Sequence, residues 1–158
     1  MNAVAEAAKR EFLTCRLGDE TYAVDILQVQ EIREVNEVTR VPHVSPFVRG
    51  VINLRGAIVP IVDLGLMFGF PEPAQLTGAS AIVLDVDNRL MGLVVSSVSD
   101  VLQLAADEIA PTPELGTRAI AAAIAGIGSR REANGAPATS VLLLDVDYVM
   151  RRVREERA

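Results

Sequence analysis

The hydrophobic stretch at residues 50–64, GVINLRGAIVPIVDL, decides how this chain folds. Arg55 is its one cation and Asp63 its one anion. Two aliphatic runs, Val51–Leu54 and Ala57–Val62, lie on either side of Arg55 and the glycine that follows it. Aliphatic runs joined by a short connection that contains glycine are typical of a β-hairpin. The stretch therefore predicts two strands that turn at Arg55.

The first of these strands also predicts which side chains reach the surface. In an extended segment, successive side chains point to opposite faces. Ile52 and Leu54 then form the pair that faces the core, while Asn53 and Arg55 point outward. Gly56 supplies the positive φ that a tight turn needs.

Other aliphatic runs follow the same pattern of strand and turn. Two further hairpins are predicted where such runs surround Gly, Asp and Asn: Phe12–Leu17 with Thr21–Val24, and Ala81–Val86 with Leu90–Val95. Their positions suggest an internal duplication. At a constant offset Tyr22 aligns with Met91 and Glu31 with Asp100, and at a larger offset Asp63 aligns with Asp145.

The residues after the two aligned aspartates predict helices. Apolar residues follow both Asp63 and Asp145 at helical spacing, so each aspartate is expected to be an N-cap. We therefore predict a mainly β fold of two duplicated barrels with about five strands each, plus short helices. The expected boundary is near residues 71–73. The predicted parts are an N-terminal tail 1–11, subdomains at about 12–70 and 79–146, and a C-terminal helix at about 146–157.

Composition excludes several classes of function. The 158-residue chain has a formal net charge of −6, and nucleic-acid binding usually needs a basic stripe. It holds one cysteine and one histidine, so an internal disulfide is impossible and a zinc site is not expected. Cys15 lies in a strand-like run and is expected to be a small buried hydrophobe. Without an apolar span or a signal-peptide core, a cytoplasmic protein is expected.

No motif predicts catalysis. His43 lies in a loop bracketed by prolines, without a Ser or Cys motif to accompany it. The stretch Asp85–Asn88 lacks the glycine and distal glutamate of a calcium loop, and Gly50–Gly56 lacks the Lys-Ser/Thr of a phosphate loop. No catalytic residue, metal or cofactor is therefore predicted. A duplicated aliphatic barrel without visible chemistry favours an interaction module.

Several ordered blocks of the sequence resemble the CheW family, the adaptors of bacterial chemotaxis signalling. The resemblance runs from about Phe12 to Met150. The matching blocks are Leu17–Ile26, Val29–Arg33, Gly50–Gly56, Ile58–Leu64, Ser99–Leu102 and Ile109–Pro111. It implies two intertwined SH3-like five-stranded β-barrels and a non-enzymatic role. The implied partners are the cytoplasmic tip of a methyl-accepting chemoreceptor and the regulatory domain of a CheA-type histidine kinase, within receptor arrays.

We expect a receptor-binding edge formed by Val29, Glu31, Asn53 and Arg55, in which Asn53 is included because it points outward beside Arg55. Family positions that match Val29, Glu31 and Arg55 border the groove that takes the receptor hairpin. Val29, Glu31 and Arg33 share one face if their segment is extended. We expect Glu31 and Arg55 to pair at this rim and to orient the guanidinium towards a partner. Kinase-facing residues are not assigned.

Plainer interpretations stay open at this point. Arg55 can be an ordinary turn residue, Glu31 a solvated strand residue and Val29 part of the core. The chain can also serve a parallel pathway of pilus or gliding motility. A small barrel that binds a metabolite is a third alternative, which a ligand-dependent melting shift would favour.

Overall fold

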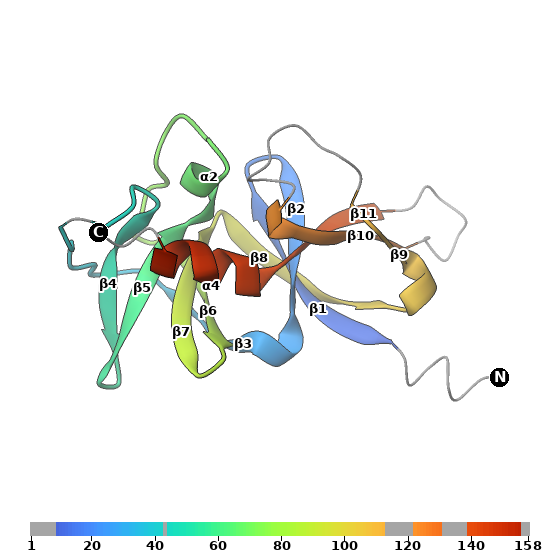
Figure 1. Cartoon of the computed structure of the whole chain (residues 1–158), viewed down its shortest axis with the longest axis horizontal. Coiled ribbons are helices and arrows are strands. Elements are labelled where there is room, and N and C mark those ends of the chain that lie inside the picture. The colour runs from blue at the N-terminus through green and yellow to red at the C-terminus, as the bar shows by residue number, and fades with distance from the viewer. Residues whose placement is uncertain (1–8, 43, 113–121, 131–138, 156–158) are drawn as a thin grey trace. The chain divides into compact units, whose positions relative to one another are not determined.

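The computed structural model describes residues 9–42, 44–112, 122–130 and 139–155 (Figure 1). The chain forms two compact units. Unit 1 comprises residues 1–27 and 98–145, and unit 2 comprises residues 28–97 and 146–158.

Strands dominate both units, as the sequence predicts. Unit 1 contains β1 (Arg10–Leu17), β2 (Glu20–Asp25), β8 (Ser97–Leu104), η2 (Ala106–Glu108), β9 (Ile109–Ala110), β10 (Ile124–Arg130) and β11 (Thr139–Leu144). Unit 2 contains β3 (Val29–Glu34), β4 (Val48–Leu54), β5 (Ala57–Asp63), α2 (Leu64–Met67), β6 (Ser80–Val86), β7 (Arg89–Val95) and α4 (Val146–Glu155). The short helix η1 (Ile26–Gln28) lies where the chain passes from unit 1 to unit 2.

Each unit is built on one sheet that combines strands of both sequence repeats. The sheet of unit 1 has the order β8-β1-β2-β11-β10-β9, and that of unit 2 has the order β3-β6-β7-β5-β4. The hairpin of each repeat joins the remaining strands of the other repeat through a parallel pair. Strand β5 pairs with β7, and β11 pairs with β2. The two repeats are therefore intertwined.

This exchange differs from the subdomains at 12–70 and 79–146 that the sequence suggests. A periodic repeat shows that the halves are alike, but two like halves offer equivalent strand edges. The same sequence pattern is therefore compatible with strands that pair within one repeat and with strands that pair between the two repeats. The units follow the second arrangement, so the proline-rich stretch 71–73 lies inside unit 2.

In each sheet the two edge strands are consecutive in the chain, an order that suits a sheet closing into a small barrel. In unit 1 the edges β8 and β9 are joined through the single turn of η2. In unit 2 the edges are β3 and β4, and Thr39, in the connection between them, forms a bridge with Val51. Bringing edges together in this way is how small barrels avoid exposed strand edges. The expected strand number holds for unit 2, while unit 1 adds the two-residue strand β9.

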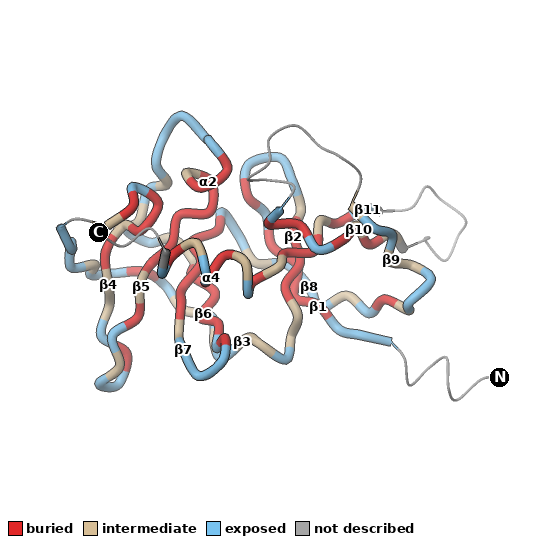
Figure 2. Tube along the Cα trace, in the orientation of Figure 1, coloured by how far each residue is buried: buried red, intermediate tan, exposed pale blue. Residues whose placement is uncertain are grey.

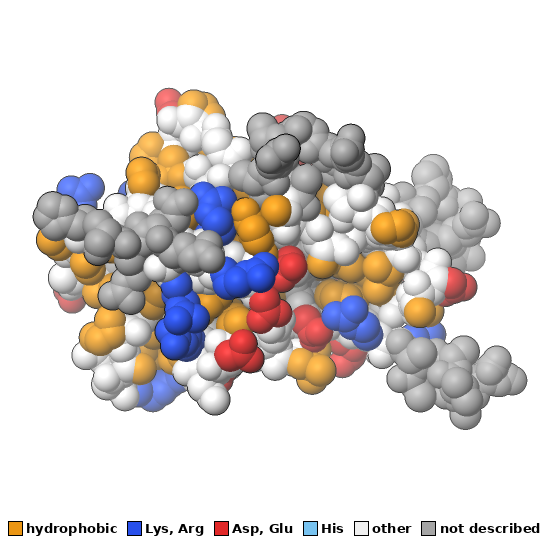
Figure 3. Space-filling view, viewed as in Figure 1, with side chains coloured by type: hydrophobic (Ala, Val, Ile, Leu, Met, Phe, Trp, Pro, Cys, Tyr) orange, Lys and Arg blue, Asp and Glu red, His pale blue; other side chains and the backbone are white. Residues whose placement is uncertain are grey.

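An aliphatic core fills each unit (Figure 2). In unit 1 a cluster of buried side chains contains Phe12, Ala23, Leu104, Val141 and Leu143. In unit 2 a cluster contains Leu54, Val59 and Val83, with Ile52 packed against it. The prediction that Ile52 and Leu54 face inward is therefore confirmed. Most charged side chains lie at the surface (Figure 3).

The predicted hairpins and helices form with small changes at their ends. The loops are two residues long, Gly18-Asp19, Arg55-Gly56 and Asp87-Asn88. Asp63 caps α2 as expected, since its Oδ1 accepts a hydrogen bond of 3.2 Å from the Leu66 N–H. Asp145 directly precedes α4, whose apolar residues Val146, Val149, Met150 and Val153 are all buried. Across the described ranges, no helix has the length and hydrophobicity needed to cross a bilayer.

Candidate functional site

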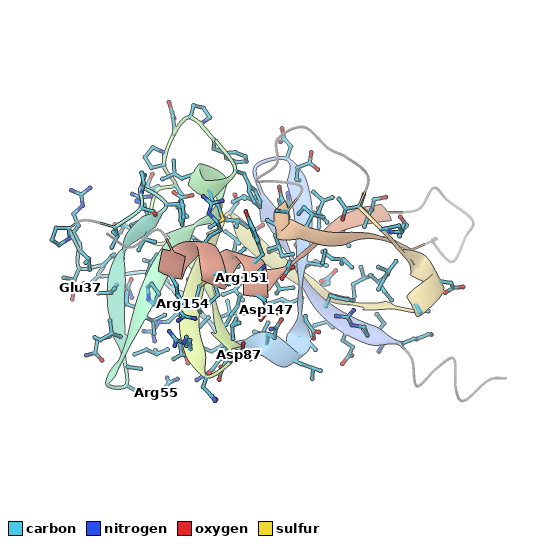
Figure 4. The ribbon with its side chains drawn as sticks, viewed as in Figure 1. Glu37, Arg55, Asp87, Asp147, Arg151 and Arg154 are labelled. Atoms are coloured by element: carbon cyan, nitrogen blue, oxygen red, sulfur yellow. The ribbon has the colours of Figure 1, made fainter. Side chains whose placement is uncertain are left out.

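The candidate site is the edge of unit 2 where β3 approaches the turn between β4 and β5. Arg55 lies at the tip of this hairpin (Figure 4). Its Nη2 donates a hydrogen bond to Glu31 Oε2 over 2.6 Å, so the predicted pair forms. The Arg55 side chain is 65% exposed and that of Glu31 is 26% exposed. The pair is thus open to solvent and to a partner on the arginine side.

The backbone at Arg55 adopts a conformation that arginine seldom takes. Its φ is 51°, and the φ of Gly56 is 91°. Both values match a type I′ turn, which joins twisted strands well and favours Asn-Gly. Gly56 behaves as the sequence predicts, whereas a positive φ at Arg55 is not foreseen. A left-handed conformation costs a non-glycine residue about 1–2 kcal/mol, so the hairpin holds Arg55 under local strain.

Asn53 supports this turn from within. Its Oδ1 accepts a hydrogen bond of 2.9 Å from the Gly56 N–H. The turn between β6 and β7 uses the same device, because Asp85 Oδ1 accepts from the Asn88 N–H at 3.0 Å. Asn53 is exposed, as predicted, but its carbonyl oxygen is already engaged within the hairpin. The amide NH₂ group of Asn53 is left to donate to a partner.

A bulge separates Val29 from the other predicted site residues of β3. Val29 pairs with Leu84 on β6, whereas Glu31 pairs with Val83, so the register shifts between them. Adjacent residues of β6 point to opposite faces, and cross-strand partners share a face. The bulge interrupts the regular alternation on which a shared face of Val29 and Glu31 depends, so that expectation stays a prediction. For Arg33, which pairs with Ala81, the expectation holds.

The charges at this edge leave an excess of positive charge. Arg33 Nη1 lies 3.6 Å from Glu31 Oε1, so Glu31 lies between two guanidinium groups. The Arg33 side chain is 37% exposed. One carboxylate cannot neutralise two arginines, and planar guanidinium groups suit carboxylates and backbone carbonyls. This edge can therefore bind an acidic or carbonyl-rich partner surface.

A buried ion pair, which the sequence does not reveal, holds the base of the same hairpin. Arg49 Nη1 donates to Asp63 Oδ2 at 3.0 Å and to the Ala74 carbonyl at 2.8 Å. The same Asp63 oxygen accepts from the Ala74 N–H at 2.8 Å. Asp63 thus joins β5, β4 and the segment after α2, in addition to capping that helix. The sequence hints at this pair only because Arg49 and Arg55 are the cations nearest to Asp63 along the chain.

The described residues include two further kinds of reactive side chain, a thiol and possible metal ligands. Cys15 is buried as predicted, and burial raises the pKa of its thiol from 9.0 to about 12. The part of the chain that the structure describes holds no cluster of three or more His, Cys, Asp or Glu suited to a metal ion. His43 lies outside the described residues.

Two sheets of this topology, with a charged, solvent-accessible edge, define a protein built from paired small β-barrels. The chain belongs to the CheW-like domain family, whose match covers residues 11–154. The resemblance drawn from the sequence blocks is thereby confirmed.

Relatives from several bacteria carry chemotaxis names. The chain is 39% identical over 145 residues to the chemotaxis protein CheW of Klebsiella aerogenes, across 92% of this chain and 84% of that protein. It is 41% identical over 106 residues to the chemotaxis protein CheW of Rhizobium meliloti, across 67% and 68% of the two chains.

A solved structure has a similar fold. The crystal structure of the scaffolding protein TtCheW from Thermoanaerobacter tengcongensis matches with a TM-score of 0.72 and 25% sequence identity. The match covers 86% of this chain and 88% of that one. The mainly β class with a C-terminal helix is therefore confirmed.

Proposed function

We propose that this protein is a non-enzymatic adaptor of chemotaxis signalling in the cytoplasm. It couples the cytoplasmic tip of a methyl-accepting chemoreceptor to the regulatory domain of a CheA-type histidine kinase. The receptor contacts the edge formed by Glu31, Asn53 and Arg55, with Val29 close by. The chemotaxis names of the relatives favour this pathway over pilus or gliding motility.

The observation that carries this proposal is the strained, paired arginine at the hairpin tip. A type I′ turn is better served by Asn than by Arg at this position. Strain of this kind is a reason to suspect that the side chain serves a function. Glu31 holds the guanidinium in place while about two thirds of the side chain stays exposed. In this arrangement Arg55 is oriented before a partner arrives.

The pair itself adds little to stability. Exposed ion pairs contribute between about 0 and 1 kcal/mol, because water screens the charges and two long side chains must be ordered. Orientation is the more valuable effect, since Arg55 then presents its remaining N–H donors outward. A partner with a carboxylate or a free carbonyl at the right place completes the contact.

Substituting Arg55 by Asn separates binding from folding. Arg55→Asn removes the guanidinium but suits the turn, so the free energy of unfolding should stay equal or rise. Binding to a purified receptor-tip fragment should weaken about tenfold, the loss of one charge-assisted contact. Isothermal titration calorimetry measures the binding, and urea denaturation measures the stability.

Arg16→Asn is the matched control, because Arg16 is an exposed arginine of unit 1 whose guanidinium donates to a turn carbonyl and, among the described residues, has no acidic partner. Receptor affinity should be unchanged in this variant. If Arg55→Asn binds the receptor-tip fragment with unchanged affinity, Arg55 is not part of the receptor site. Failure of the unmodified protein to bind both the receptor tip and the kinase regulatory domain would reject the adaptor function.

A further inference from the structure

A second surface of unit 2 is a groove that the candidate site does not use. Its volume is about 630 Å³. Four segments of unit 2 contribute: the connection before β4, the β4–β5 hairpin, the start of β7, and α4. The principal apolar lining residues are Val41, Val51, Ile58, Leu90, Met150 and Val153.

The groove has a buried floor and exposed walls. Met150 and Val153 lie on one face of α4 and are each 5% exposed, so they form part of the floor. Ile58 is 62% exposed and Val41 is 37% exposed. Large aliphatic side chains left this open beside a depression are the usual mark of an interaction surface.

Two arginines stand at the rim, and they indicate the charge of the occupant. Arg89 comes from the start of β7 and Arg154 from the last turn of α4. Both are exposed, and neither forms an ion pair or side-chain hydrogen bond with any residue in the described ranges. Among the described lining residues, none is Asp or Glu.

The charge of this rim is opposite in sign to the net charge of the chain. The chain carries a net charge of −6, and the arginines Arg10, Arg49 and Arg55 each have an acidic partner. In Figure 3 arginines (blue) adjoin hydrophobic side chains (orange) around α4, where Figure 4 labels Arg154. Unpaired cations beside an apolar groove complement a segment that is apolar on one side and acidic at its edge.

We infer that this groove binds an acidic amphipathic segment of a partner protein. The partner places aliphatic side chains against Ile58 and Val153, while its carboxylates pair with Arg89 and Arg154. A second copy of this chain is the less suitable occupant, since two molecules of the same net negative charge repel each other. The inference does not rest on the proposed function, because Glu31 and Arg55 do not line the groove.

The test uses a short fluorescent peptide that alternates Leu and Val with Glu, and a matched peptide with Lys in place of Glu. The full-length protein should bind the acidic peptide at least about tenfold more tightly than the basic one by fluorescence anisotropy, as expected for two complementary charge pairs. Amide chemical-shift changes on binding should centre on Val51, Ile58 and Val153.

Variants test whether the arginines at the rim and the aliphatic wall of the groove contribute to peptide binding. Arg89→Glu combined with Arg154→Glu should weaken binding of the acidic peptide at least about tenfold, and Ile58→Ser should weaken it through lost apolar contact. Arg16→Glu, a single charge reversal on unit 1, is the control for a change in net charge and should leave binding unchanged. Arg55→Asn should also leave it within about twofold, which separates this surface from the receptor edge.

Several results would overturn the inference. Equal affinity for both peptides would show that charge complementarity does not determine binding. Chemical-shift changes confined to unit 1 would show that the peptide binds outside the groove. Sedimentation equilibrium measures whether the protein forms a dimer. A dimer that dissociates in the Ile58→Ser variant would make a second copy the occupant instead of an acidic partner.

Discussion

Asn53 and Arg55 have different roles in one tight turn: Asn53 stabilises the turn, and Arg55 presents a side chain for binding. Asn53 closes the turn through the Gly56 N–H, whereas Arg55 accepts an unfavourable φ of 51° and contributes only its side chain to the surface. Two neighbouring outward residues therefore have different roles. Removing Asn53 should affect the stability of the hairpin, and removing Arg55 should affect what the hairpin can bind.

Cys15 and Tyr22 predict how stability depends on alkaline pH. Burial raises the pKa of Cys15 from 9.0 to about 12 and, together with the Glu20 charge, raises that of Tyr22 from 10.0 to about 12. The folded state therefore keeps these protons at a pH where the unfolded chain has lost them. Stability should be full below pH 9 and should fall as pH rises from 9 towards 12.

Urea denaturation between neutral and alkaline pH checks this expectation. For each proton the free energy of unfolding should fall by up to about 1.4 kcal/mol per pH unit. Cys15→Ala, which removes one of the two groups, should give a shallower decline. A stability that stays constant up to pH 12 would contradict the prediction.

At the scale of elements, one carboxylate fixes the position of several segments. Asp63 is only 1% exposed, and it ties β5 to α2, to Arg49 on β4 and to Ala74. A single change at Asp63 leaves a partly buried guanidinium and two backbone N–H groups without their acceptor. Buried pairs broken on one side are costly because the charge that is left cannot be solvated.

Asp63→Ala should therefore lower the free energy of unfolding by about 3–5 kcal/mol. Glu31→Gln is the matched comparison, since it removes the carboxylate of the exposed pair and should cost less than about 1 kcal/mol. Both values come from urea denaturation at neutral pH. Similar small losses in the two variants would show that the Asp63 contacts do not stabilise the fold.

For the whole molecule, the exchange of hairpins makes the two halves of the sequence interdependent. Strands β1 and β2 belong to the first repeat, yet β2 pairs with β11 of the second. In the same way β7 of the second repeat pairs with β5 of the first. Neither half of the chain holds all the strands of one sheet.

Separate fragments of residues 1–70 and 71–158 should accordingly not fold alone. Each fragment should lack a cooperative thermal transition by circular dichroism, because its sheet would be missing the strands that the other fragment supplies. An equimolar mixture should regain β structure and a cooperative transition. Cooperative unfolding of fragment 1–70 by itself would favour the division at 71–73.

Much of the fold, and part of the candidate site, can be predicted from the sequence. Aliphatic runs and turn residues locate the hairpins, since both depend on local backbone preferences. The pair of Glu31 and Arg55 is also foreseen, because the resemblance to the CheW family implies that both residues border one groove. The bulge after Val29 and the positive φ of Arg55 are not, since they depend on how β3 and the hairpin fit their neighbours.

The sequence by itself determined the strands, the turns and the helix cap at Asp63, because those features arise from interactions between residues close in the chain. It also determined the duplication, because a repeated pattern of residues can be read directly from the sequence. Tertiary structure alone decided which repeat pairs with which, since two similar repeats present interchangeable strand edges. It also decided that Asp63 meets Arg49 and that Arg89 and Arg154 border one groove. Such contacts join residues distant in sequence, and no periodic pattern records them.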